Sequence, residues 1–149
     1  MVAKPVYLDV CALCRPYDDQ SQIRIQLETN AINLILAYAR QGKLSLAVSP
    51  AHFLEIENIP EQEERTQLLL LLDGLGKRID GNMKPARKRA EELVAQGVGI
   101  SDAAHVAFAE LAHADFVSVD DRLLKKLRQL SLSNWHGSPT FYCDKEQLK

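Results

Sequence analysis

The stretch from Gly99 to Asp121, GISDAAHVAFAELAHADFVSVDD, constrains the fold of this chain more than any other. Ser101 is a favoured N-cap residue, and Asp102 then falls in the first helical turn, where a carboxylate suits the positive end of the helix dipole. After this helix, residues 116–119 form a short apolar run typical of a buried strand, which ends at Asp120. Helix starts and strand carboxyl ends lie on the same edge of an open α/β sheet, so Asp102 and Asp120 are predicted to face one another across a cleft.

Length and composition predict one domain, spanning residues 1–149, with 46% hydrophobic residues to form its core. The formal net charge of −2 argues against a chain that wraps nucleic acid by bulk charge, although it does not exclude a local basic patch. No apolar segment reaches the roughly 18 residues that a membrane span needs. The 3 cysteines, an odd number, do not suggest a secreted disulfide framework. We therefore expect a cytoplasmic protein without a membrane segment.

Segments with strand and helix character alternate along the chain. Strands are predicted at 5–8, 44–48, 116–119 and 140–143, and helices at 21–40, 50–58, 61–72, 83–96, 101–112 and 121–130. This alternation predicts an α/β fold with a mainly parallel sheet. Five consecutive leucines, Leu68–Leu72, cannot all face one side of a helix, so we expect this helix to be buried, most simply against a second subunit.

Four acids are predicted to gather at the carboxyl edge of this sheet. Asp9 ends the first strand, and Glu55 lies one short helix beyond the second; Asp102 and Asp120 join them. Two carboxylates about 4 Å apart repel by roughly 1–4 kcal/mol between bulk-water and near-surface dielectric, and a divalent cation removes this repulsion. Ligands that are all oxygen favour Mg²⁺ or Mn²⁺, ions that bind phosphate oxygens and activate water. The pattern therefore favours nuclease chemistry.

Four segments of the chain resemble the PIN-domain ribonucleases, a family that includes the VapC-type toxins of bacterial toxin–antitoxin pairs. The segments are Val6–Asp9, Ser49–Glu55, Asp102–Ala107 after a Gly-Ile-Ser lead, and Val117–Asp121. They occur in the family's order and spacing and extend over nearly the whole chain. The resemblance implies a three-layer α/β/α sandwich, often dimeric, so we expect a homodimer.

The resemblance also implies the active-site residues. The acids of the metal site would be Asp9, Glu55, Asp102 and Asp120, with Asp9, Asp102 and Asp120 holding Mg²⁺ or Mn²⁺. Ser118 would supply a supporting hydroxyl. His105 lies on the same helix face as Asp102 and would support the site, although a capping or core role suits a histidine equally well. The implied function is metal-dependent cleavage of RNA, with an antitoxin protein as a partner if the chain is a toxin.

One departure from the family concerns the two residues after the first acid. The family usually has Thr and then Asn or Ser, whereas this chain has Val10 and Cys11. A hydrogen-bonding partner of the acids is thus replaced by an aliphatic group and a weak thiol donor, which bears on catalytic strength. The main alternative is a catalytically weak or inactive PIN-like module that binds RNA or protein.

Two further patterns have weaker functional readings. Cys11 and Cys14 have the spacing of a redox dithiol, but the proline loop after them suits a redox helix poorly, and buried free cysteines are the simpler reading. Basic residues cluster at Lys84–Arg89 and Arg122–Arg128. They would flank a groove that binds a nucleic-acid backbone, or form solvated helix faces.

Overall fold

Five parallel strands form the centre of the molecule in the computed structural model, which describes residues 3–149. The strands are β1 (Lys4–Leu8), β2 (Leu44–Val48), β3 (Lys77–Arg78), β4 (Asp115–Val117) and β5 (His136–Gly137). Their order in the sheet is β3-β2-β1-β4-β5, and every neighbouring pair is parallel. The predicted α/β fold with a parallel sheet is therefore confirmed, and β1 lies at its centre.

Helices fill the connections between the strands. They are α1 (Val10–Cys14), α2 (Ile23–Arg40), α3 (Pro50–Ile56), α4 (Gln62–Leu75), α5 (Lys84–Ala95), α6 (Ile100–Leu111), α7 (Asp121–Arg128) and α8 (Pro139–Lys145), with a 3-10 turn, η1, at Arg15–Tyr17. Pro50 at the first position of α3, with Ser49 before it as the N-cap residue, agrees with the sequence prediction. No helix within residues 3–149 is both long and apolar enough to cross a membrane.

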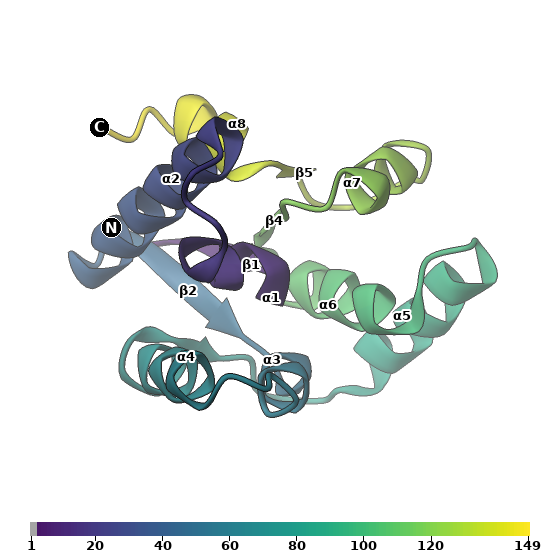
Figure 1. Ribbon diagram of the computed structural model, residues 1–149. Coiled ribbons are helices and arrows are strands. Elements are labelled where there is room, and N and C mark those ends of the chain that lie inside the picture. The colour runs from purple at the N-terminus through teal and green to yellow at the C-terminus, as the bar shows by residue number, and fades with distance from the viewer. Residues whose placement is uncertain (1–2) are drawn as a thin grey trace.

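Alternating side chains of the strands pack into two apolar clusters on opposite faces of the sheet. On one face, Val6 and Leu8 of β1 belong to a cluster that includes side chains of α1, α2, α4 and α8; on the other, Tyr7 of β1 belongs to a cluster that includes side chains of α5, α6 and α7. Figure 1 shows α2 and α4 to the left of the sheet and α5, α6 and α7 to its right. The molecule is thus built as helix, sheet and helix layers.

Residues 140–143 were predicted as a strand, and that prediction is wrong, because they lie inside α8. Ser138 accepts a hydrogen bond from the Phe141 N–H at 3.3 Å, and Pro139 occupies the first turn, so this segment starts as a capped helix. A run of only four residues does not distinguish a strand from a helix turn. The last strand is instead the short β5.

Two other sequence predictions change in the structure. The central helix α6 begins at Ile100 with Gly99 as its N-cap, so Ser101 is not the cap, although Asp102 remains in the first turn. Residues 10–14 form the helix α1, whereas no helix was predicted there. The Asp9 side chain caps α1 by accepting a hydrogen bond from the Ala12 N–H at 3.0 Å.

The leucine run of α4 packs largely inside this chain. Leu68 and Leu72 are buried in the core, and Leu69 and Leu71 pack against the same cluster. Only Leu70 is extensively exposed, at 61%. The run therefore needs no second subunit to bury it, and the homodimer stays a prediction without this support.

Candidate active site

Three of the four predicted acids lie where the carboxyl ends of the central strands meet the starts of helices. Asp9 follows β1 and caps α1, Asp120 follows β4 and caps α7, and Asp102 lies in the first turn of α6. Glu55 lies near the end of α3, the helix that follows β2. We call this set, Asp9, Glu55, Asp102 and Asp120, the acidic edge.

Asp9 is the buried member of the acidic edge, with 4% of its surface exposed. Burial raises the pKa of its carboxyl group to about 6, although the Ser118 hydroxyl, the Cys11 thiol and the Ala12 N–H favour the charged form. Its Oδ1 accepts from the Cys11 thiol and from the Ala12 N–H, each at 3.0 Å. A carboxylate that the fold keeps buried without a cationic partner is costly, and this suggests a function for it.

The charged form of the Asp102 carboxyl group is disfavoured by burial and by nearby negative charges. Burial raises the pKa of its half-buried carboxyl group, and the charges of Asp120 and Glu55 raise it further, while His105 lowers it. Asp120 is exposed and uses Oδ1 to accept from the N–H groups of Arg122 and Leu123 at 3.0 and 3.1 Å. Asp102 and Asp120 are therefore close enough for their charges to repel.

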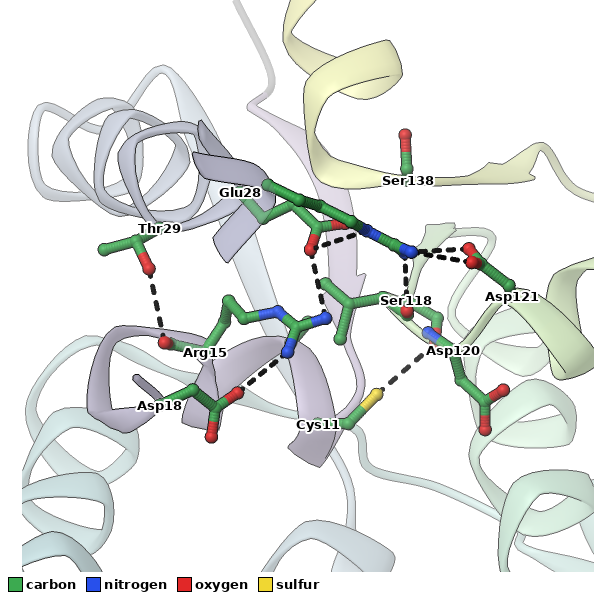
Figure 2. A network of polar contacts seen from close by, with 12 residues as sticks. Cys11, Arg15, Asp18, Glu28, Thr29, Ser118, Asp120, Asp121 and Ser138 are labelled. Carbon is green, nitrogen blue, oxygen red and sulfur yellow. Dashed lines mark hydrogen bonds and ion pairs between the residues drawn. The ribbon is translucent and has the colours of Figure 1, made fainter. Parts of the chain in front are cut away.

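The Cys11 thiol lies between Asp9 and Ser118. It lies 3.0 Å from Asp9 Oδ1 and 3.4 Å from Ser118 Oγ, and Figure 2 shows Cys11 and Ser118 pointing toward one another. Ser118 Oγ also accepts from the Asp120 N–H at 3.1 Å. Burial and the Asp9 charge raise the pKa of Cys11, so it stays a neutral thiol and donates to Asp9. Cys11 and Ser118 thus link Asp9 to the loop that carries Asp120.

The donor set of the acidic edge fits a hard divalent cation in charge and in chemistry. Asp9, Asp102 and Asp120 offer carboxylate oxygens, and no Lys or Arg of residues 3–149 forms an ion pair with them. Across the same residues, no three His, Cys, Asp or Glu side chains lie close enough together to hold an ion as they stand. Coordination would therefore require Asp102 and Asp120, which are half-buried and exposed, to turn toward Asp9.

The arrangement of strands and helices is found in a solved structure. A chain of "2.2 A resolution structure of VapBC-1 from nontypeable Haemophilus influenzae" aligns with a TM-score of 0.57 over 91% of this chain and 98% of that one. The two chains share a fold. Their sequences are 14% identical, so the likeness concerns the fold alone, and it confirms the predicted three-layer α/β/α sandwich. No protein-family profile and no curated protein matches the sequence.

A network of arginines and acids, which the sequence reading missed, supports the loop that carries Asp120. Glu28 of α2 has a 5% exposed side chain, and its Oε1 lies 3.0 Å from Arg15 Nη2 and 3.4 Å from Arg24 Nε.

Arg24 also connects this network to the loop between β4 and α7. It binds Asp121 at 2.7 Å and donates to the Val119 carbonyl at 3.3 Å. Figure 2 shows Arg15 between Asp18 and Glu28. The network ties η1, α2 and the β4–α7 loop together beside the acidic edge.

The redox reading of Cys11 and Cys14 gains no support from the structure. Both cysteines are free and lie in α1. Burial raises the pKa of Cys14 to about 12, with the Glu64 side chain adding to the shift, and it raises the pKa of Cys11 as well. A redox dithiol needs a thiolate of lowered pKa, so these two thiols have the opposite character.

The basic clusters are partly paired within the chain. Arg89 of α5 binds Glu110 at 2.7 Å and Glu92 at 3.3 Å, and Arg87 lies 3.4 Å from Glu91. These pairs neutralise half of the Lys84–Arg89 cluster, which behaves as a solvated helix face. The Arg122–Arg128 cluster of α7 begins two residues after Asp120 and is the better placed of the two to meet a phosphate backbone.

Proposed function

We propose that the protein is a metal-dependent endoribonuclease that hydrolyses RNA phosphodiester bonds at the acidic edge, leaving a 3′-hydroxyl and a 5′-phosphate. The main support for the proposal is the environment of Asp9. Asp9 has a buried carboxyl group beside β1 whose charge no cation of residues 3–149 balances, and it faces an edge with further acids. RNA as the substrate comes from the family resemblance.

In this proposal each acid has its own role. Asp9, Asp102 and Asp120 would hold Mg²⁺ or Mn²⁺, which when bound supplies the charge that activates water and stabilises the leaving oxygen. Glu55 would orient or deprotonate the attacking water, since its carboxylate is exposed at the edge. Ser118 and Cys11 would keep the Asp9 carboxylate and the loop that carries Asp120 in a fixed position relative to one another.

The test is cleavage of a mixed RNA pool by the purified protein with Mn²⁺. We expect products that disappear with EDTA and that do not form with Asp120→Asn. Asp121→Asn is the matched comparison: Asp121 is the next residue and pairs with Arg24 in the network that supports the Asp120 loop, so this variant should slow cleavage without abolishing it. Cleavage that survives EDTA, or equal cleavage by both variants, would contradict the proposal. Metal binding without cleavage would instead favour the PIN-like binding module.

The Cys11 thiol should be a weak but necessary partner of Asp9. Cys11→Ala removes the 3.0 Å contact to Asp9 Oδ1 and is expected to slow cleavage about tenfold, the equivalent of one hydrogen bond to a charged group. Cys11→Ser supplies a stronger donor and should match or exceed wild type. Cys14→Ala, a further thiol of the same short helix, is the control. Initial rates in Mn²⁺ measure the effect, and a Cys11→Ala rate equal to wild type would show that the thiol is not needed.

The proposed partners follow from the same reading. The VapBC-1 likeness and the family resemblance support an antitoxin protein as a partner and a toxin–antitoxin pair as the setting. A homodimer is proposed from the family resemblance alone.

A further inference from the structure

A chain of buried hydrogen bonds runs from the sheet centre to the acidic edge. The Tyr7 hydroxyl of β1 lies 2.6 Å from His105 Nδ1 of α6 and 2.7 Å from the Ser49 hydroxyl. His105 Nε2 lies 2.6 Å from Glu55 Oε2. Tyr7, Ser49 and His105 are each at most 2% exposed, whereas the Glu55 side chain is 44% exposed. We call Tyr7, Ser49, His105 and Glu55 the tyrosine chain, and Glu55 is its solvent-facing end.

The chemistry of the groups fixes the direction of the hydrogen bond at the Glu55 end of the tyrosine chain. The Glu55 carboxylate only accepts, so His105 carries its proton on Nε2 and donates it to Glu55. We assign the neutral form to His105: its Nδ1 accepts from the Tyr7 hydroxyl, and the Ser49 hydroxyl donates to Tyr7, whereas a charged ring would reverse both hydrogen bonds.

A second histidine, His52, lies at the buried end of the tyrosine chain, next to Ser49. His52 Nε2 lies 2.7 Å from the Leu8 carbonyl, which only accepts, and His52 Nδ1 accepts from the Ser49 N–H at 3.0 Å. Burial lowers the pKa of His52 to about 4, so the ring is neutral and both of its nitrogens are used. The Ser49 hydroxyl lies 3.5 Å from His52 Nδ1 and 2.7 Å from the Tyr7 hydroxyl, so Tyr7 is its closer partner. Because this end lies inside the protein, the chain is suited to holding Glu55 in place and not to carrying protons to solvent.

We propose that Tyr7 is a positioning residue, which acts through His105 to fix the Glu55 carboxylate at the acidic edge. The proposal rests on the proposed function, in which Glu55 handles the attacking water. An exposed glutamate near the end of a short helix samples several rotamers, and a single short hydrogen bond from a buried ring selects one of them. Tyr7 in turn gives the buried Nδ1 a donor, without which the His105 ring would turn away.

The test compares Tyr7→Phe with Tyr142→Phe. Tyr142 is also fully buried, but its hydroxyl has no hydrogen-bond partner within residues 3–149, so removing that oxygen should change nothing in the site. Tyr7→Phe is expected to lower kcat about tenfold to a hundredfold with KM unchanged, the range seen when outer partners of metal-site histidines are removed. Tyr142→Phe is expected to keep both constants.

NMR of ¹⁵N-labelled histidine tests the geometry without any cleavage. Wild type and Tyr142→Phe should show His105 in one form, protonated on Nε2, with a slowly exchanging ring proton. Tyr7→Phe should lose that proton signal and show exchange between ring forms. A single unchanged form in Tyr7→Phe would overturn the proposal, whether or not the protein cleaves RNA.

Replacing His105 itself gives a rescue that does not depend on how well Tyr7→Phe folds. His105→Gln keeps a donor for Glu55 and an acceptor for Tyr7, so it should retain more kcat than His105→Leu, which keeps neither. Equal kcat for the two variants would overturn the proposal. A wild type that cleaves no RNA would refute the proposed function, and the NMR experiment would then decide the role of Tyr7 in holding the His105–Glu55 contact.

Discussion

Asp9→Asn is expected to abolish RNA cleavage and, at the same time, to stabilise the metal-free protein at neutral pH. Asp9 is 4% exposed, and burial raises the pKa of its carboxyl group from 3.8 to about 6. At pH 7 the folded protein therefore holds this carboxylate charged at a cost of about 3 kcal/mol, at 1.36 kcal/mol per pKa unit. Asparagine keeps the oxygen that accepts from the Ala12 N–H and removes the charge.

The pH dependence follows from the sign of the shift. The folded pKa of Asp9 lies above the unfolded value, so the folded state binds the proton more tightly. The free energy of unfolding should therefore fall as pH rises from about 4 to about 6, and the loss should be complete above pH 6. Asp9→Asn lacks this contribution, so its advantage over wild type should grow across the same interval.

Thermal unfolding in EDTA measures the effect. At pH 7, Asp9→Asn should melt about 6–12 °C above wild type, from about 3 kcal/mol at 2–4 °C per kcal/mol for a domain of this size. Asp121→Asn is the control of opposite sign, because Arg24 lowers the pKa of Asp121 and its loss cannot stabilise the fold. Mn²⁺ should raise the melting temperature of wild type and leave that of Asp9→Asn unchanged. A variant that melts below wild type at pH 7, or that cleaves at the wild-type rate, would refute this account of Asp9.

The positions of the acids were predictable because they depend on local signals. Asp9 and Asp120 each follow an apolar strand, and Asp102 lies in the first turn of a helix, so strand ends and helix starts place them without knowledge of distant contacts. Parallel strands then bring these positions to one edge. How tightly the side chains gather there was not predictable, since it depends on rotamers and on partners such as Cys11.

The partners of Tyr7 and Glu28 were not predictable from local patterns. Tyr7 bonds to His105, which is 98 residues away, and a tyrosine inside a strand otherwise signals only a buried, β-favouring residue. Glu28 lies at a buried position of α2, where an acid interrupts the apolar face. An acid at a buried helix position predicts that it has a cationic partner. The sequence does not show that Arg15 and Arg24 are these partners. Residues 140–143 show a different limit, because a segment of only four residues carries too little periodicity to choose between helix and strand.

Glu28→Ala is expected to cost about 3 kcal/mol of stability, in the range found when one partner of a buried ion pair is removed. Its side chain is 5% exposed and lies 3.0 Å from Arg15 and 3.4 Å from Arg24. Without it, the Arg15 guanidinium, whose side chain is 17% exposed, keeps only the more exposed Asp18 as an acidic partner. Urea denaturation measures the loss as a lower midpoint.

Glu91→Ala gives the matched comparison for this buried pair. Arg87 and Glu91 repeat the helical spacing and the 3.4 Å distance of Arg24 and Glu28, but their side chains are 84% and 70% exposed. An exposed pair of this kind contributes about 0.3–0.5 kcal/mol, so Glu91→Ala should barely move the midpoint. Glu28→Ala should also slow cleavage, because Arg24 would lose part of the support that lets it hold the Val119 carbonyl just before Asp120. Equal midpoints for the two variants would mean that burial adds nothing to the Glu28 network, and the link from α2 to the Asp120 loop would then have to rest on Arg24 and Asp121 alone.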